Sequence, residues 1–101
     1  MEKFFANRNY ELVFYISYDL VTEKINQMIL EYARQLKYSG ACNIDIPVSI
    51  RKNLSYAIKK NTLGHFVEIN FTSSPLFLPI LEKKLRLDKN IIRAFIIKLK
   101  N

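Results

Sequence analysis

Two pairs of basic residues stand at the ends of one alternating segment, residues 51–60, and the chemistry they offer is anion binding. Arg51 and Lys52 open the segment, and Lys59 and Lys60 close it. Guanidinium and ammonium groups hold phosphate and carboxylate oxygens through charge-assisted hydrogen bonds. Between the pairs, apolar residues recur at every second position, which is the period of a half-buried strand. We therefore expect a strand with cations at both ends, which either meet a polyanion or lie in a solvated hairpin.

Basic residues also gather towards both termini of the chain. The further candidates for anion binding are Arg8, Arg86, Lys89 and Arg93. In total, 16 Lys and Arg outnumber 9 Asp and Glu, which gives a formal net charge of +7. A charge excess of this size on a small domain attracts polyanions at long range. Nucleic acid is the expected partner, and the alternative is a basic protein without an acidic ligand.

Residues that would support enzymatic chemistry are sparse. His65 is the single histidine and has no acid or nucleophile in evident partnership, so we expect no general-base role. Cys42 is the single cysteine; it fits a reducing compartment, and we expect it to be an ordinary small core residue. Two glycines are too few for a phosphate-cradling loop, and the sequence has no Cys/His cluster for zinc. We expect no catalysis, no cofactor, no metal and no small-molecule substrate.

Length and hydropathy indicate one soluble domain that covers residues 1–101. Half of the residues are apolar, which suffices for a compact core without a metal or a disulfide. No apolar run approaches the ~20 residues that span a bilayer, so we expect no membrane partner. The residues before the first predicted strand are too few for a signal peptide.

Hydrophobic periodicity predicts a strand and then a helix in the first part of the chain. Residues 9–17 alternate with a period of two and are largely apolar on both faces, as in a central strand. Thr22 is expected to cap a helix whose apolar stripe continues to Leu36. Gly40 is expected to end this helix in the left-handed conformation.

The middle of the chain predicts two strands joined by a hairpin. From residue 41 the period is two again, and the even-numbered residues of 42–58 are expected to share one face. Pro47 lacks a backbone donor, so it requires a bulge or an edge position. A hairpin connection at residues 59–64 then leads to a third strand at 65–71, with Val67, Ile69 and Phe71 directed inward.

The last part predicts a helix and a strand. Residues 74–87 begin with a Ser-Pro helix start and carry leucines at helical spacing. Pro79 either lies in the first turn of a helix that begins at Leu78, or kinks an earlier turn. Residues 90–100 are an almost continuous β-branched and aromatic strand.

This order compacts as a split βαβ pair, a four-stranded antiparallel sheet with two helices on one face. The other face is left bare, and the first and last strands direct apolar side chains towards it. The expected set is Val13, Tyr15, Ile92, Ala94 and Ile96, or the opposite residues of each strand. An exposed apolar face of this kind usually marks a binding surface.

Three segments of the chain, residues 9–17, 51–71 and 81–98, resemble one known family in order and spacing. The most specific pieces are Leu54, Ser55, Tyr56, Ile58 and Lys60 after the first basic pair, and Leu85, Arg86 and Leu87 followed by Asn90, Ile91 and Arg93. In these the chain resembles protein six of the bacterial-type small ribosomal subunit, a family also found in mitochondria and plastids.

The resemblance implies an α+β, ferredoxin-like βαββαβ sandwich that binds small-subunit rRNA as a heterodimer with small-subunit ribosomal protein eighteen. The eight basic residues named above would then meet rRNA or the partner protein. The implied location is the small ribosomal subunit, in the mitochondrial matrix, a plastid or a bacterial cytoplasm.

Two other functions are compatible with this element order. An RNA-recognition-motif-like module would bind single-stranded RNA, but Gly64 and Ile69 stand where two aromatic residues of its stacking platform belong. A small enzyme such as an acylphosphatase would need an anion-cradling loop after the first strand. Residues 18–24 supply acids there and no glycine.

Overall fold

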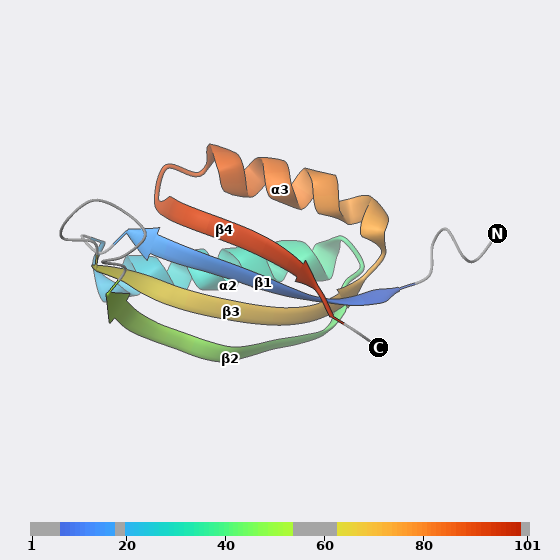
Figure 1. Cartoon of the computed structure of the whole chain (residues 1–101), viewed down its shortest axis with the longest axis horizontal. Helices are drawn as coiled ribbons and strands as arrows, with labels where there is room; N and C mark the ends of the chain where they lie inside the picture. The colour runs from blue at the N-terminus through green and yellow to red at the C-terminus, as the bar shows by residue number, and fades with distance from the viewer. Residues whose placement is uncertain (1–6, 18–19, 54–62, 100–101) are drawn as a thin grey trace.

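The fold is a four-stranded antiparallel sheet with two helices packed on one face (Figure 1). The structure is a computed structural model that describes residues 7–17, 20–53 and 63–99, with only the backbone described for 51–53 and 63. Its elements in chain order are β1 (Arg8–Ser17), α2 (Thr22–Tyr38), β2 (Cys42–Asn53), β3 (Leu63–Ser73), the 3-10 turn η1 (Pro75–Phe77), α3 (Leu78–Leu87) and β4 (Ile91–Lys98). This order is the one predicted from hydrophobic periodicity.

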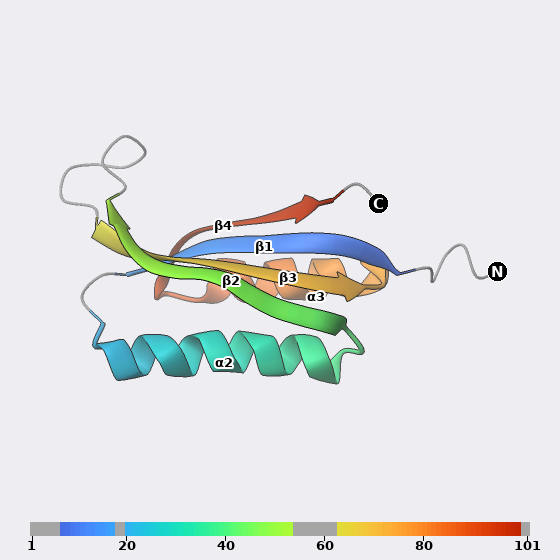
Figure 2. The same ribbon diagram turned by 90° about the horizontal axis from the view of Figure 1, so that it is seen from below.

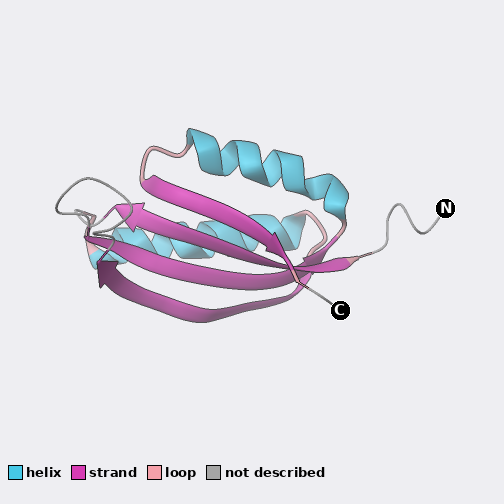
Figure 3. Ribbon diagram, in the orientation of Figure 1, coloured by secondary structure: helices cyan, strands magenta, loops and turns pink. Residues whose placement is uncertain are grey.

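The strands lie side by side in the order β2, β3, β1, β4, and every neighbouring pair is antiparallel (Figure 3). The central pair, β1 and β3, runs in unbroken register from Arg8 opposite Ser73 to Ser17 opposite Gly64. Seen at right angles to the first view, α2 and α3 lie on the same side of the sheet (Figure 2). We call the side without helices the open face.

The core lies between the sheet and the two helices. It contains Tyr10, Leu12, Phe14 and Ile16 of β1, Ile25, Ile29, Tyr32 and Leu36 of α2, Val67, Ile69 and Phe71 of β3, and Leu81 and Leu85 of α3. Period two on the strands and the i, i+3, i+4 stripe on the helices bring these residues to one layer. The inward set predicted for β3 is therefore confirmed.

The helix ends follow the predicted signals in two cases out of three. Gly40 has φ of 98° just beyond the end of α2, as predicted, because a residue with a Cβ is strained there. Pro79 lies in the first turn of α3, which confirms the first of its two predicted placements. The expectation that Thr22 caps α2 is wrong. The first intrahelical bond runs from the Ile25 amide to the Val21 carbonyl (3.1 Å), so Val21 is the N-cap and no described side chain caps the helix.

β2 departs from its predicted alternation. Its pairing with β3 shifts register between Cys42 and Asp45 and again between Asp45 and Val48, so the bulge predicted near Pro47 is found, on an edge strand. The expected single even-numbered face is wrong, because Ile44 packs against the core while Cys42, Val48 and Ile50 pair with open-face residues of β3. An extra residue in a bulge reverses which parity faces inward.

Cys42 is exposed, contrary to the expectation of a core residue. It pairs with Thr72, whose neighbours Phe71 and Ser73 are buried on the helix side, so Cys42 lies on the open face. The adjacent Asn43 has φ of 54°, which turns the chain at the start of the strand. Residues 54–62, which include Lys59, Lys60 and most of the predicted hairpin connection, lie outside the described part of the chain. Leu63 and Gly64, predicted to belong to that connection, instead begin β3.

Candidate nucleic-acid interface

One end of the sheet gathers basic residues from three separate parts of the chain. Here β2 ends and β3 begins, with Arg51 opposite His65 and Lys52 opposite Gly64. β1 ends at the same place, since Ser17 pairs with Gly64 and its amide donates to the Asn90 carbonyl oxygen at 2.8 Å. The last turn of α3 and the start of β4 therefore lie at this end as well (Figure 1).

We call this end the cationic end and define it by Arg51, Lys52, Arg86, Lys89 and Arg93. The first two are placed by backbone register alone, and the other three have exposed side chains. Among the described side chains, the one ion pair joins Arg34 to Glu31 on α2 at 3.3 Å. The exposed cations of the cationic end are therefore not neutralised by a described carboxylate.

The turn that presents Lys89 is held by a hydrogen-bond network. Asp88 accepts from the Tyr32 hydroxyl (2.7 Å) through Oδ2 and from the Asn90 amide (3.0 Å) through Oδ1. Burial, together with the bond to Asp88, raises the pKa of Tyr32 well above its usual range. The Lys84 ammonium lies 5.4 Å from the centre of the Tyr32 ring. Sequence reasoning missed this network, although an Asp two residues before an Asn is a common turn signal.

The predicted site residues do not all come together. Arg8 begins β1 opposite Ser73, at the far end of the sheet from the other cations. Its guanidinium donates to the carbonyl oxygen of the adjacent Asn7, at 3.5 Å. The eight predicted residues thus divide into five at the cationic end, Arg8 at the opposite end, and the two lysines at 59 and 60 outside the described residues.

The open face is apolar next to the cationic end. β1 contributes Val13 and Tyr15, and β4 contributes Arg93, Phe95 and Ile97, which pair with Tyr15, Val13 and Glu11 in turn. Of the residues predicted to face outward, Val13 and Tyr15 of β1 do so. On β4 the alternative set lies outward, because Ala94 and Ile96 pack against the core. Phe95 and Ile97 remain 48% and 45% exposed. The Tyr15 ring packs on Phe66 of β3 with the ring centres 4.9 Å apart.

Carboxylates occupy the open face beyond these apolar residues. Glu11 of β1 lies beside Glu68 of β3, and Asp45 pairs with Asn70 farther along β3. Desolvation, a hydrogen bond to Glu68 and the charge of Glu68 all raise the pKa of Glu11. The sequence alone did not pair Glu68 with Glu11, which meet because both residues occupy outward positions of neighbouring strands.

His65 has a partner that the sequence did not reveal. Its Nε2 lies 2.8 Å from the Ser49 hydroxyl, so the two side chains join β2 to β3 on an exposed part of the sheet. Within the residues that the structure describes, no group of three His, Cys, Asp or Glu side chains could hold a metal ion. In the same residues, no helix is long and apolar enough to cross a membrane.

Comparison with known proteins identifies the family of this chain. A family model described as ribosomal protein S6 matches residues 9–98 of the chain. The chain belongs to the ribosomal protein S6 family. This S6-family chain is accordingly a structural protein of the small ribosomal subunit and takes part in translation without being an enzyme.

Relatives of this S6-family chain come from plastids and bacteria. The small ribosomal subunit protein bS6c of Porphyra purpurea is 38% identical over 84 residues, 83% of this chain and 75% of the relative. The bS6c protein of Gracilaria tenuistipitata var. liui is 38% identical over 90 residues, 88% and 86% of the two chains. The bS6 protein of Trichormus variabilis is 30% identical over 89 residues, 88% and 82% of the two chains.

The fold of S6 is also found in a solved structure. The crystal structure of 30S ribosomal protein S6 from Thermotoga maritima matches with a TM-score of 0.76 at 23% identity, covering 92% of this chain and 88% of that one. At this identity the likeness bears on the fold alone. It confirms the predicted ferredoxin-like class.

Proposed function

We propose that this protein, as a single domain over residues 1–101, binds small-subunit rRNA through its cationic end and small-subunit ribosomal protein eighteen through its open face. The observation that favours the rRNA site is the convergence of basic residues from β2, α3, the turn after α3 and β4 at one end of the sheet. Each phosphate that a cation neutralises releases counterions, so such a cluster gives affinity that depends on salt.

The open face supports a protein partner better than a nucleic acid. Exposed apolar side chains such as Phe95 and Ile97 gain by burial against another apolar surface. Glu11, Glu68 and Asp45 place acids on the same face, where they would repel a phosphate backbone laid across the sheet. The RNA-recognition-motif alternative needs an RNA strand on that face, so the acids count against it.

The Lys89 and Arg93 side chains give a direct test of the rRNA site. The affinity of the purified protein for a central-domain fragment of small-subunit rRNA should be measured over a range of salt concentrations. Because each lost phosphate contact reduces the slope of log K against log salt by about 1, we expect Lys89→Ala and Arg93→Ala each to flatten it by that amount.

The matched control is Lys37→Ala, which removes the same charge from the last turn of α2, at the other end of the molecule. It should lower affinity only slightly and leave the slope nearly unchanged. If all three variants change the slope equally, the rRNA site is not at the cationic end.

The compartment that we propose is a plastid or a bacterial cytoplasm. The plastid and bacterial relatives named above support it over the mitochondrial matrix. Immunoblotting of purified organelles checks the choice: enrichment of the protein with mitochondrial and not plastid ribosomes would contradict it.

A further inference from the structure

The two edge strands of the sheet differ in how well they are protected from pairing with another strand. β2 contains Pro47 and two register shifts, devices that prevent a strand from pairing along its free edge. β4 has neither over most of its length. Its register with β1 is unbroken from Lys98 opposite Tyr10 to Arg93 opposite Tyr15.

The register shows which backbone groups of β4 point away from the sheet. The Leu99 amide donates to the Asn9 carbonyl oxygen at 2.8 Å, so this pair is a hydrogen-bonded one. In an antiparallel pair, hydrogen-bonded and non-hydrogen-bonded positions alternate. Residues 93, 95 and 97 therefore bond to β1, whereas the amides and carbonyls of Ala94, Ile96 and Lys98 point outward. Within the described chain, no other strand pairs with this edge.

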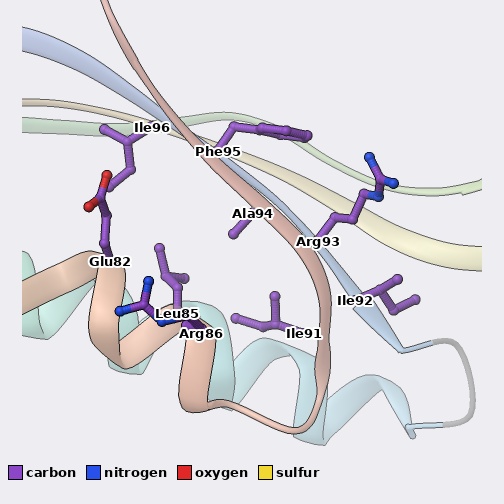
Figure 4. A pocket seen from close by; sticks show the side chains of 9 residues that line it. All are labelled: Glu82, Leu85, Arg86, Ile91, Ile92, Arg93, Ala94, Phe95 and Ile96. Carbon is purple, nitrogen blue, oxygen red and sulfur yellow. The ribbon is translucent and has the colours of Figure 1, made fainter. Parts of the chain in front are cut away.

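A groove runs beside this edge, between β4 and α3. It has a volume of about 470 Å³ and is lined by Glu82, Leu85 and Arg86 of α3 and by residues 91–96. Leu85, Ile91 and Ala94 form its apolar floor, while Glu82 and Arg86 stand on the helix side (Figure 4). A strand added to β4 would direct every second side chain into this groove and the others next to Phe95 and Ile97 on the open face.

We propose that the free edge of β4 receives an extended segment of a partner polypeptide as a fifth strand. The segment has apolar side chains at alternate positions, which fill the groove against Leu85 and Ala94. Main-chain hydrogen bonds to residues 94, 96 and 98 hold it in place, and the groove selects its side chains. This inference rests on the proposed function, in that the partner is the protein that covers the open face.

Other occupants fit this edge less well. An RNA strand has no row of alternating amide donors and carbonyl acceptors to match the outward groups of β4. A second copy of the chain would have to approach a surface of the same sign, because each copy has a net charge of +7. The described cations next to the edge, Arg86, Arg93 and Lys98, add to that repulsion locally.

Amide hydrogen exchange tests the proposal on the unaltered protein. The probe is the purified small-subunit ribosomal protein eighteen of the same organism, mixed in excess. In the free protein the amides of Ala94, Ile96 and Lys98 should exchange fast, and those of Phe95 and Ile97 should be protected by β1. On complex formation we expect the outward amides to slow by more than about tenfold.

Two negative results are distinguishable. If protein eighteen does not bind, the partner part of the proposed function is wrong and this inference falls with it. If it binds and the outward amides still exchange as in the free protein, the strand addition alone is wrong. A shift to a dimer of this chain in sedimentation equilibrium, with the same amides protected, would also overturn the proposal of a different partner chain.

A pair of variants separates the contribution of the Ile96 amide to binding from that of its side chain. Ile96→Pro removes an amide that points outward and is not used by β1, so the sheet can tolerate it at an edge. Ile96→Ala keeps that amide and shortens the side chain. We expect Ile96→Pro to weaken binding of protein eighteen at least about tenfold more than Ile96→Ala does. Equal affinities would contradict the backbone pairing. If the proline variant does not fold, the exchange experiment on the unaltered protein is the test.

Discussion

Replacing Tyr32 by Phe removes one hydroxyl group from the network that holds the turn before β4. The ring is 2% exposed and packs on Phe14, with the ring centres 5.4 Å apart, so the Phe side chain fits the same space. What is lost is the bond from the hydroxyl to Asp88 at 2.7 Å. The substitution therefore measures that bond with little change in packing.

The expected loss in the free energy of unfolding follows from the chemistry of Tyr32 and Asp88. A hydrogen bond to a charged group contributes about 1.5–3 kcal/mol. Asp88 is only half-buried, so water replaces the lost donor and the cost lies near the lower end, about 1.5 kcal/mol. In a domain of this size such a loss lowers Tm by about 6–12 °C.

Urea unfolding of Tyr32→Phe, Asp88→Asn and the double variant measures the coupling between the two residues. The Asp88→Asn substitution keeps a side-chain oxygen that can accept from the Asn90 amide, so the double-mutant cycle isolates the bond between residues 32 and 88. A coupling energy below about 0.3 kcal/mol would show that the bond does not hold the turn.

The same residue predicts a dependence on alkaline pH. The pKa of Tyr32 is raised in the folded protein above the ordinary value of 10.0. Above about pH 10 the Tyr32 hydroxyl of the unfolded chain loses a proton that the folded chain keeps. The contribution of Tyr32 to stability is therefore full below that pH and falls as pH rises. The free energy of unfolding should fall by about 1.4 kcal/mol per pH unit more steeply in the wild type than in Tyr32→Phe. Parallel curves would refute this.

Three further predictions concern the core, one turn and one thiol. Leu12→Ala should cost about 2–5 kcal/mol in urea unfolding, because the side chain is fully buried in the central strand; a loss below about 1 kcal/mol would contradict its place in the core. Gly40→Ala should cost about 1 kcal/mol, since the space around a new Cβ is open and only the φ of 98° opposes it; a more stable variant would contradict that conformation. Cys42 in the free folded protein should react with an aromatic disulfide reagent as fast as in urea, and protection until unfolding would show that it is buried.

The elements and the core were predictable because local pattern and tertiary packing agree in this chain. The alternation in β1 grouped Tyr10, Leu12, Phe14 and Ile16 on one face but left open which face meets the helices, and the stripe in α2 placed its four core residues. Pro79 was left with two placements. The first turn of α3 accepts it because that amide has no intrahelical partner.

The errors came from features that pattern alone does not determine. β2 has two register shifts, so Ile44 packs against the core while Cys42, Val48 and Ile50 lie on the open face, and only the pairing with β3 fixes where such shifts fall. The neighbouring carboxyl groups of Glu11 and Glu68 lie far apart in the printed sequence and meet only because β1 and β3 are adjacent. The basic residues could be named from the sequence, but only the topology separates Arg8 from the cationic end.

The most direct measurement of the ribosomal role is the sedimentation of a tagged copy of this protein expressed in its own organism. Lysate is run on a sucrose gradient at low salt, and the fractions are probed for the tag and for small-subunit rRNA. We expect the tag to sediment with small-subunit particles, and Lys89→Ala combined with Arg93→Ala to release it at lower salt than the wild type. A tag that stays at the top of the gradient at low salt, in a copy shown to be folded, would contradict incorporation into the small subunit.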